Sequence, residues 1–416
     1  MSRTVAWRFT VVMFWGFSLL TLPVWMRTMS SGWDARVYDR ALHWTAAGRD
    51  PYAEGIAQEE AYEKAVVHPD GATEPFAYVY SPMTLRLLRV LALVPDGLRH
   101  VELWFLYALG ALAQILVTMR MAADSEKKWI ALLAPAAIYF PGMLHCGVIL
   151  SGNIAYLLYG LVLTTALFGW RRGQWLWFYA AVLIASCFKA PYLCLLAIPV
   201  FSARRQWLPA GMAAGAGVAL FAGQSLFWPS EFAHYLLAVE KQFSLNHDFG
   251  ASPAGVLGYF LQNTQGAFEF VPALFYFGYA ALILLALGTL SRRYLRGELS
   301  APQYLPVLLI GVILLNPRHI EYDLAPLTLP IALVGMRLLG WATRRVVCCT
   351  LWLGLVSAAN VAIIEYGNGL VWRMSECSVL VVCFAGGCWQ LRRQSAVVPA
   401  RDASQVHGMR HELVNS

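Results

Sequence analysis

Apolar runs long enough, or nearly long enough, to cross a lipid bilayer recur along the whole chain, and they constrain its fold more than any other feature. A crossing helix needs about 20 apolar residues. Because lipid offers the backbone no hydrogen-bond partner, each run is predicted to be an α-helix that satisfies its own amides. The sequence therefore predicts an all-α integral membrane protein. The runs begin at Trp7, His100, Trp129, Ile154, Leu208, Val271, Tyr304, Leu324, Val346 and Glu376.

The composition excludes a soluble protein. The chain has 59% hydrophobic and only 13% charged residues, whereas soluble domains carry about a quarter charged residues. Because the apolar runs continue from end to end, residues 1–393 are expected to form one polytopic domain. Beyond Gln394 the chain becomes polar and loses periodicity, so residues 394–416 are predicted to be a disordered cytoplasmic tail.

The apolar run from Trp175 to Phe201 is too long for a single crossing. The sequence Lys189-Ala190-Pro191 interrupts it near its middle. Because proline breaks a helix interior, two crossings that meet at Lys189 are predicted.

Pairs of arginines at the ends of the runs set the expected orientation, because short basic loops stay in the cytoplasm. They account for the net charge of +7, and no nucleic-acid partner is expected because they do not share one face. The clusters are Arg3 with Arg8, Arg171–Arg172, Arg204–Arg205, Arg292–Arg293, Arg344–Arg345 and Arg392–Arg393. Both termini are then cytoplasmic, and the opposite side receives the loops 27–77, 145–153, around 189, 229–252, 316–323 and 365–375.

One early segment must fail to cross for this topology to hold. Four candidates, 78–95, 100–119, 129–146 and 154–170, connect an outer loop to an inner one. The segment 78–95 contains two arginines and two prolines, so it is predicted to be juxtamembrane or re-entrant. About twelve transmembrane helices then remain.

The polar chemistry is concentrated in the first outer loop, residues 27–77. It contains nine acids against five bases, in a chain that is basic overall. A loop of this length is usually functional or disordered, and its many aromatic residues favour order. Asp34 precedes a helical pattern over 35–47 that Gly48 and Pro51 end. Asp34 is therefore either the N-cap of a surface helix or a functional carboxylate.

Other polar residues lie where their helices reach the same side of the membrane. These are Asn153, Lys189, Arg318 and His319, and the last two share their loop with Glu321 and Asp323. Taken singly, Lys189 could be a lysine that snorkels to the interface, and Arg318 and His319 could belong to a solvated loop. Together with Asp34 they provide a carboxylate, an amide and three cationic groups, which suits an anionic lipid-linked substrate.

Several short motifs occur in a fixed order along the chain. The motifs are Asp34-x-x-Val37-Tyr38, Gly48-Arg49-Asp50-Pro51-Tyr52, Tyr80-Ser81-Pro82, Gly152-Asn153, Lys189-x-Pro191 and Pro317-x-His319. Together they resemble glycosyltransferase family 87, the polyprenyl-phosphate-mannose-dependent mannosyltransferases of the GT-C class. The resemblance extends from the first loop to about residue 330, although the segment 59–74 contains no motif of that family.

The resemblance implies roles for individual residues. Asp34 is expected to be the catalytic base. Lys189 and His319 match polar positions near the donor in that family. With Arg318, added because its guanidinium can hold a phosphate in bidentate fashion, they are expected to bind the donor phosphate. Tyr38, Tyr52, Tyr80 and Asn153 are expected to contact substrate. The fold implied is a GT-C helical bundle with juxtamembrane helices in the long first loop.

The function implied is transfer of a hexose, with mannose as the expected sugar, from a polyprenyl-phosphate sugar to an envelope glycolipid or glycan. The reaction is expected on the non-cytoplasmic side of a bacterial-type plasma membrane, with inversion at the anomeric carbon and membrane lipids around the protein. No metal or cofactor is expected, since the loop lacks a cluster of ligands. The eight cysteines lie mostly in apolar runs, without a C-x-x-C pair.

Two other functions remain open at this point. A transporter or flippase of lipid-linked or small polar solutes predicts ionisable residues near the middle of spans. Most charges lie instead at the ends of the runs, with Lys189 as the main exception. A polymerase or ligase of lipid-linked glycans would share the outer arginine and histidine but does not need the Asp34 motif.

Overall fold

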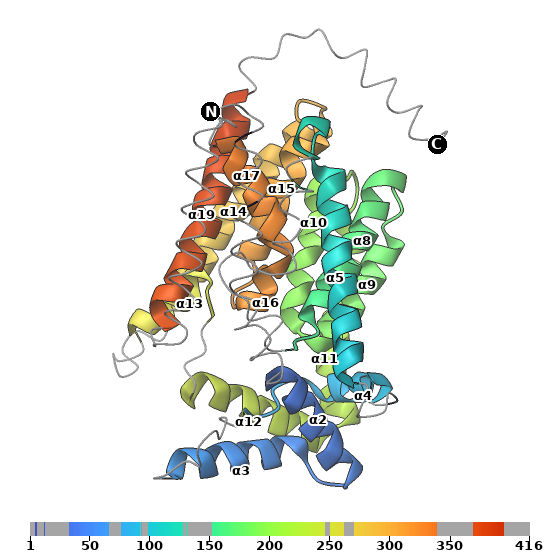
Figure 1. Ribbon diagram of the computed structural model, residues 1–416, viewed down its shortest axis with the longest axis vertical. Helices are drawn as coiled ribbons and strands as arrows, with labels where there is room; N and C mark the ends of the chain where they lie inside the picture. Colours follow the sequence, from blue (N-terminus) through green and yellow to red (C-terminus); the bar gives the residue numbers. More distant parts are fainter. Residues whose placement is uncertain are drawn as a thin grey trace.

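The computed structural model of the protein (Figure 1) describes residues 33–65, 76–91, 99–127, 152–245, 250–261, 270–338 and 369–394, together with a few isolated positions. All regular elements in these ranges are helices. The predicted spans that begin at Trp7, Trp129 and Val346, and the tail from residue 395, lie outside the described residues.

A bundle of roughly parallel and antiparallel helices forms the larger part of the molecule (Figure 1). Three stretches in the described ranges are long and apolar enough to cross a membrane: α11, α14 and Arg373–Arg393 of α19. The bundle consists of α5 (Arg99–Met121), α8 (Ala155–Arg172), α9 (Leu176–Phe188), η2 (Ala190–Leu196), α10 (Ala197–Ser202), α11 (Trp207–Phe227), α13 (Pro253–Leu261), α14 (Val271–Leu295), α15 (Ala301–Leu314), α16 (Glu321–Leu324), η3 (Ala325–Leu327), α17 (Thr328–Leu338) and α19 (Gly369–Gln394).

Small residues allow α5 and α8 to pack closely. A Cβ atom placed on Gly160 would lie 3.0 Å from the Cα of Gly110. Without a hydrophobic driving force between helices in lipid, such close backbone approach provides the van der Waals contact that holds them together. α8 then ends at Gly173, whose φ of 70° is the left-handed conformation that a helix C-terminus favours.

The ends of several bundle helices meet at the end of the bundle that carries the arginine pairs. Trp170 Nε1 donates to Ser202 Oγ at 2.8 Å, and Arg204 donates to the Leu295 carbonyl at 3.1 Å. Arg293 donates to the Leu391 carbonyl at 2.9 Å. The described arginine pairs, predicted to share one side of the membrane, therefore lie at one end of the bundle.

Arg337 and Glu126 form a bidentate ion pair, with N–O distances of 2.7 and 2.6 Å.

The long apolar run divides at Lys189, as predicted from the sequence. α9 ends at Phe188, and Lys189 is extended, with φ −145° and ψ 116°. The chain then returns, because the Trp170–Ser202 bond places Ser202 beside the end of α8 from which α9 begins. Each half has 13 residues, 176–188 and 190–202.

Four further helices form a layer across the opposite end of the bundle (Figure 1). They are α2 (Trp33–Ala46), α3 (Pro51–Lys64), α4 (Pro82–Leu91) and α12 (Pro229–Leu245). We call these four helices the end layer. α4 has ten residues and a length of about 15 Å, which is too short to cross the bilayer and agrees with the segment predicted not to cross.

Two details of the end layer differ from the sequence prediction. The range 229–252 was expected to be a loop, yet it contains the 17-residue helix α12. α2 begins at Trp33, so Asp34 lies in its first turn and is not the residue before the helix. An aspartate in the first turn still interacts favourably with the helix dipole, which explains why the pattern suggested a cap.

A hydrogen bond and an ion pair hold α12 against α3. His234 of α12 is hydrogen-bonded to Asp50, the residue before α3. Lys241 of α12 forms an ion pair with Glu60 within α3. Asp50 is also the N-cap of α3, accepting from the Tyr52 amide at 2.9 Å.

The end layer is joined to the bundle through α4. Pro191 has no N–H, so it cannot donate to the Cys187 carbonyl four residues earlier. The hydroxyls of Ser81 and Thr84 donate to that carbonyl instead, at 3.1 and 2.7 Å. In addition, the Met83 amide donates to Gln224 Oε1 of α11 at 2.8 Å. The break at Lys189 therefore provides the acceptor that fixes α4 to the bundle.

Candidate active site

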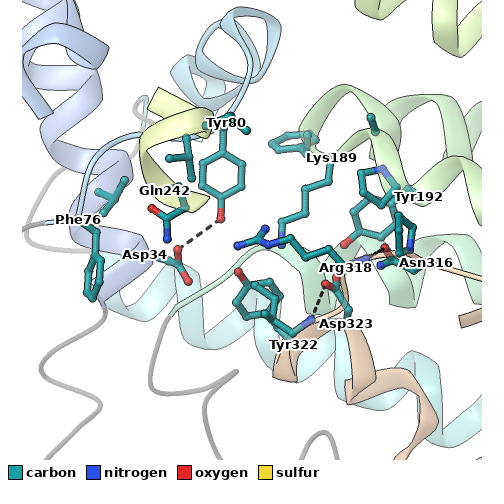
Figure 2. A pocket seen from close by; sticks show the side chains of 18 of the residues that line it. Asp34, Phe76, Tyr80, Lys189, Tyr192, Gln242, Asn316, Arg318, Tyr322 and Asp323 are labelled. Carbon is teal, nitrogen blue, oxygen red and sulfur yellow. Dashed lines mark hydrogen bonds between the residues drawn. The ribbon is translucent and has the colours of Figure 1, made fainter. Parts of the chain in front are cut away.

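A cleft of about 450 Å³ lies where the end layer meets the bundle. Its walls come from elements far apart in sequence: α2, the segment before α4, the Lys189 break, α12, the loop before α16, and α19. Both polar groups and aromatic rings line it (Figure 2). Such a mixed wall, mostly apolar with a few polar groups, is typical of a small-molecule site.

Asp34 lines the cleft from the first turn of α2 and accepts two hydrogen bonds from different elements. Asn153 Nδ2 donates to Asp34 Oδ2 at 3.0 Å. Tyr80 Oη donates to Asp34 Oδ1 at 3.3 Å, the contact drawn as a dashed line in Figure 2. Each carboxylate oxygen has further lone pairs, so the group can still accept a proton from a ligand.

The orientation of Asn153 is fixed by its own backbone surroundings. Its Oδ1 accepts from the Ala155 amide at 2.8 Å, which directs Nδ2 toward Asp34. The preceding Gly152 has φ 68°, and a Cβ there would lie 3.0 Å from Ala35 Cβ. Glycine is required both by this left-handed conformation and by the close approach to α2. The Gly152-Asn153 motif thus brings α8 to the first turn of α2.

Tyrosines form a hydrogen-bonded support behind Asp34. Tyr38 Oη donates to Tyr80 Oη at 3.0 Å, and Tyr52 Oη donates to the Tyr80 carbonyl at 2.8 Å. Burial, and next the charge of Asp34, raise the pKa of Tyr38 and of Tyr80 well above the ordinary value. Both phenols therefore stay protonated at neutral pH and can donate. The sequence predicted that four residues contact substrate, namely Tyr38, Tyr52, Tyr80 and Asn153. Of these, Tyr80 lines the cleft. The other three do not line it and form hydrogen bonds to Tyr80 or Asp34.

Two cationic side chains enter the cleft on the other side of Tyr80. Lys189 Nζ lies 3.8 Å from the ring centroid of Tyr322 and 6.0 Å from that of Tyr80. Figure 2 shows the Lys189 and Arg318 side chains converging in the space between these two rings. The sequence prediction that Asp34, Lys189 and Arg318 lie at one site therefore agrees with their common place in the cleft wall.

The loop that carries Arg318 is held by the segment 250–252. The Ala251 amide donates to the His319 carbonyl at 2.6 Å, and Ser252 Oγ donates to the Pro317 carbonyl. Gly250 has φ 75°, and a Cβ there would lie 2.7 Å from the His319 carbonyl oxygen, so only glycine fits. The Asn316 side chain accepts from the Arg318 amide at 3.1 Å. These contacts fix the backbone from which Arg318 extends into the cleft.

His319 is not where the sequence suggested. Its exposed fraction is 0%, and it is absent from the cleft wall that Arg318 and Ile320 help to form. Within the part of the chain that the structure describes, neither ring nitrogen has a hydrogen-bond partner. Burial lowers the pKa of His319 to about 4, so the ring is neutral and provides no positive charge at physiological pH.

The structure adds cleft residues that sequence reasoning did not assign. Asp323 accepts from Tyr159 Oη at 3.3 Å and from the Ile320 amide at 3.2 Å. Arg373, from α19, lies 4.4 Å over the ring of Tyr259. Both belong to loops predicted to be on the Asp34 side, which was the only sequence signal. Phe76 and Gln242 also line the cleft. Phe76 belongs to the aromatic stretch at the end of the first loop, whereas no pattern in the sequence marks Gln242.

The chain matches a known protein family. The model of Glycosyltransferase family 87 matches residues 78–317, a range that includes Tyr80, Asn153 and Lys189. No curated protein and no solved structure matches the chain.

Proposed function

This chain belongs to glycosyltransferase family 87, whose model matches more than half of its length, and from that membership we propose that it transfers a hexose from a polyprenyl-phosphate sugar. Mannose is the proposed sugar, and an envelope glycolipid or glycan is the proposed acceptor. Residues 1–393 then form one membrane glycosyltransferase domain, with 27–77 as its catalytic loop.

One observation supports this proposal more than any other: the carboxylate and the cations occupy the same cleft at different places. Asp34 is held by Asn153 and Tyr80, whereas Lys189 and Arg318 lie beyond the Tyr80 ring (Figure 2). Transfer from a lipid phosphate requires both a base for the acceptor hydroxyl and cations for the departing phosphate. This cleft can provide both at once.

The reaction follows from that arrangement. The acceptor hydroxyl gives its proton to the Asp34 carboxylate while its oxygen forms a bond to C1 of the sugar. The bond between C1 and the phosphate oxygen breaks, and polyprenyl phosphate leaves with the electron pair. Lys189 as a point charge and Arg318 through its planar fork stabilise that phosphate. The proton on Asp34 then passes to water.

A single displacement inverts the configuration at C1, so a β-linked lipid donor would give an α-linked product.

His319 has a different proposed role from the one its sequence motif suggested. His319 is buried and neutral within the loop that carries Arg318, so Lys189 and Arg318, and not His319, are proposed to contact the phosphate.

The proposed location of the reaction follows from the two ends of the bundle. The arginine pairs mark the cytoplasmic end, and the cleft lies at the other end, beside the end layer. Transfer is therefore proposed on the non-cytoplasmic side of a bacterial-type plasma membrane. Both termini are proposed to be cytoplasmic.

The test is to incubate the purified protein with a panel of polyprenyl-phosphate sugars and follow release of polyprenyl phosphate. Wild-type protein should release it with one sugar preferred. Asp34→Asn should lower the rate by about 100- to 10,000-fold, the usual effect of losing a general base. Asp39→Asn is the matched control, because Asp39 is exposed on the same helix.

Three results would contradict the proposal. One is near-normal turnover by Asp34→Asn. Another is consumption of only diphosphate-linked glycans, which would indicate a polymerase or ligase. Uptake of solute into vesicles without any release of polyprenyl phosphate would indicate a transporter.

A further inference from the structure

The cleft extends past Asp34, away from the two cations. Figure 2 shows Phe76 and Gln242 beside Asp34, with Tyr80, Lys189 and Arg318 on its other side. Both residues line the cleft. The mechanism above gives neither of them a role.

The positions of these two side chains are fixed by the end layer. Phe76 lies in the segment that leads to α4, and its carbonyl accepts from Arg40 of α2 at 3.3 Å. Gln242 lies on α12, next to Lys241, which pairs with Glu60 of α3. A ring and an amide are thus presented to Asp34 by two elements that are each bound to a neighbouring helix.

The order of groups along the cleft determines which substrate meets them. The donor phosphate lies with Lys189 and Arg318, and the base must contact the hydroxyl that attacks. Whatever carries that hydroxyl therefore occupies the space on the far side of Asp34. An aromatic ring can cover the apolar C–H face of a sugar, and an amide can both donate to and accept from its hydroxyls.

We propose that Phe76 and Gln242 form the acceptor subsite and that it takes a pyranose ring, with one hydroxyl directed to Asp34. This inference rests on the proposed function. The acceptor group is then a sugar ring, and the residues that recognise it belong to the end layer and are separate from those that bind the donor.

The test separates acceptor binding from donor binding. Initial rates are measured with a polyprenyl-phosphate sugar that the wild-type protein consumes, and with octyl α-mannoside and octyl glucoside as probe acceptors. Gln242→Leu keeps the side-chain size but removes the hydrogen bond, and Phe76→Leu removes the flat face. Each should raise the acceptor KM by about 3- to 10-fold, as expected for one neutral interaction of about 1 kcal/mol. The donor KM and the hydrolysis of donor in the absence of acceptor should change less than about twofold.

Two further variants sharpen the result. Phe76→Tyr keeps the ring and should retain the wild-type acceptor KM. Glu240→Gln is the matched control on α12, because Glu240 is exposed and does not line the cleft; its kinetics should be unchanged.

Several outcomes would overturn the subsite. An unchanged acceptor KM in both leucine variants would do so, as would a rise in the donor KM instead. Donor consumption by wild-type protein without transfer to either octyl glycoside would reject the pyranose class. If wild-type protein consumes no polyprenyl-phosphate sugar at all, it is the proposed function that fails.

Discussion

Replacing Asn153 with aspartate should move the acidic limb of the pH–rate profile upward. The Asn153 amide nitrogen lies 3.0 Å from Asp34 Oδ2, so the new carboxylate would stand beside the first. Two like charges about 4 Å apart interact by about 4 kcal/mol at an effective dielectric constant of about 20. At 1.36 kcal/mol per pKa unit, this corresponds to a rise of about 3 units. Loss of the hydrogen bond to the charged form acts in the same direction.

The proposed role of Asp34 as the base determines in which pH range the substitution lowers the rate. A carboxylate takes up the acceptor proton only when it is ionised, so kcat/KM should fall at pH values below the raised pKa and recover above it. The two carboxylates titrate as a pair, so the measured value belongs to both. Initial rates of polyprenyl-phosphate release between about pH 4 and pH 9 would show the shift.

The control variant is Asn153→Ala, which removes the same hydrogen bond without adding a charge. Its acidic limb should move by about one unit or less, since a hydrogen bond to a charged group is worth about 1.5–3 kcal/mol and water replaces part of it. Superimposable profiles for wild-type protein and Asn153→Asp, in variants that elute as folded protein in detergent, would show that Asp34 is not the titrating base.

Three other expectations concern the phosphate site, the bundle and the topology. Arg318→Lys should lower kcat/KM for the donor by about 5- to 150-fold, because the charge remains but the planar fork that grips two phosphate oxygens is lost; a wild-type value would remove Arg318 from the phosphate site. Arg337→Met should lower the free energy of unfolding by about 3–5 kcal/mol because it leaves Glu126 buried without its partner, and the added change Glu126→Met should restore much of the loss in a thermal unfolding assay. In a background without native cysteines, Glu63→Cys and Glu298→Cys should react with an impermeant thiol reagent from opposite sides of the membrane; labelling of both from one side would contradict the topology.

Sequence reasoning succeeded where strong local chemistry determined the structure. The break at Lys189 follows from a proline in an over-long apolar run. The common location of Asp34, Lys189 and Arg318 follows from counting crossings between arginine pairs. Neither inference needed tertiary detail, because proline and charge placement in lipid leave few alternatives.

Other features depended on packing that the sequence does not encode locally. α12 was missed because its polar residues resemble a loop until Asp50 and Glu60 provide partners for His234 and Lys241. His319 was assigned to the donor site because of the Pro317-x-His319 motif, yet of Arg318 and His319 only Arg318 lines the cleft, and His319 is buried. Gln242 could not be recognised as a cleft residue until α12 was placed over α3.

The hydroxyls of Ser81 and Thr84 on the Cys187 carbonyl have a consequence for the spacing of the reacting groups. Asp34 belongs to the end layer and Lys189 to the bundle, so no single helix sets the distance between the proposed base and the proposed phosphate-binding cation. One link between them is direct, from Asn153 just before α8 to Asp34. The other runs through α4, which begins two residues after Tyr80, a partner of Asp34, and is fixed to the carbonyl two residues before Lys189. In the proposed reaction, the space for a sugar between Asp34 and the phosphate therefore depends in part on two hydroxyl groups that contact neither.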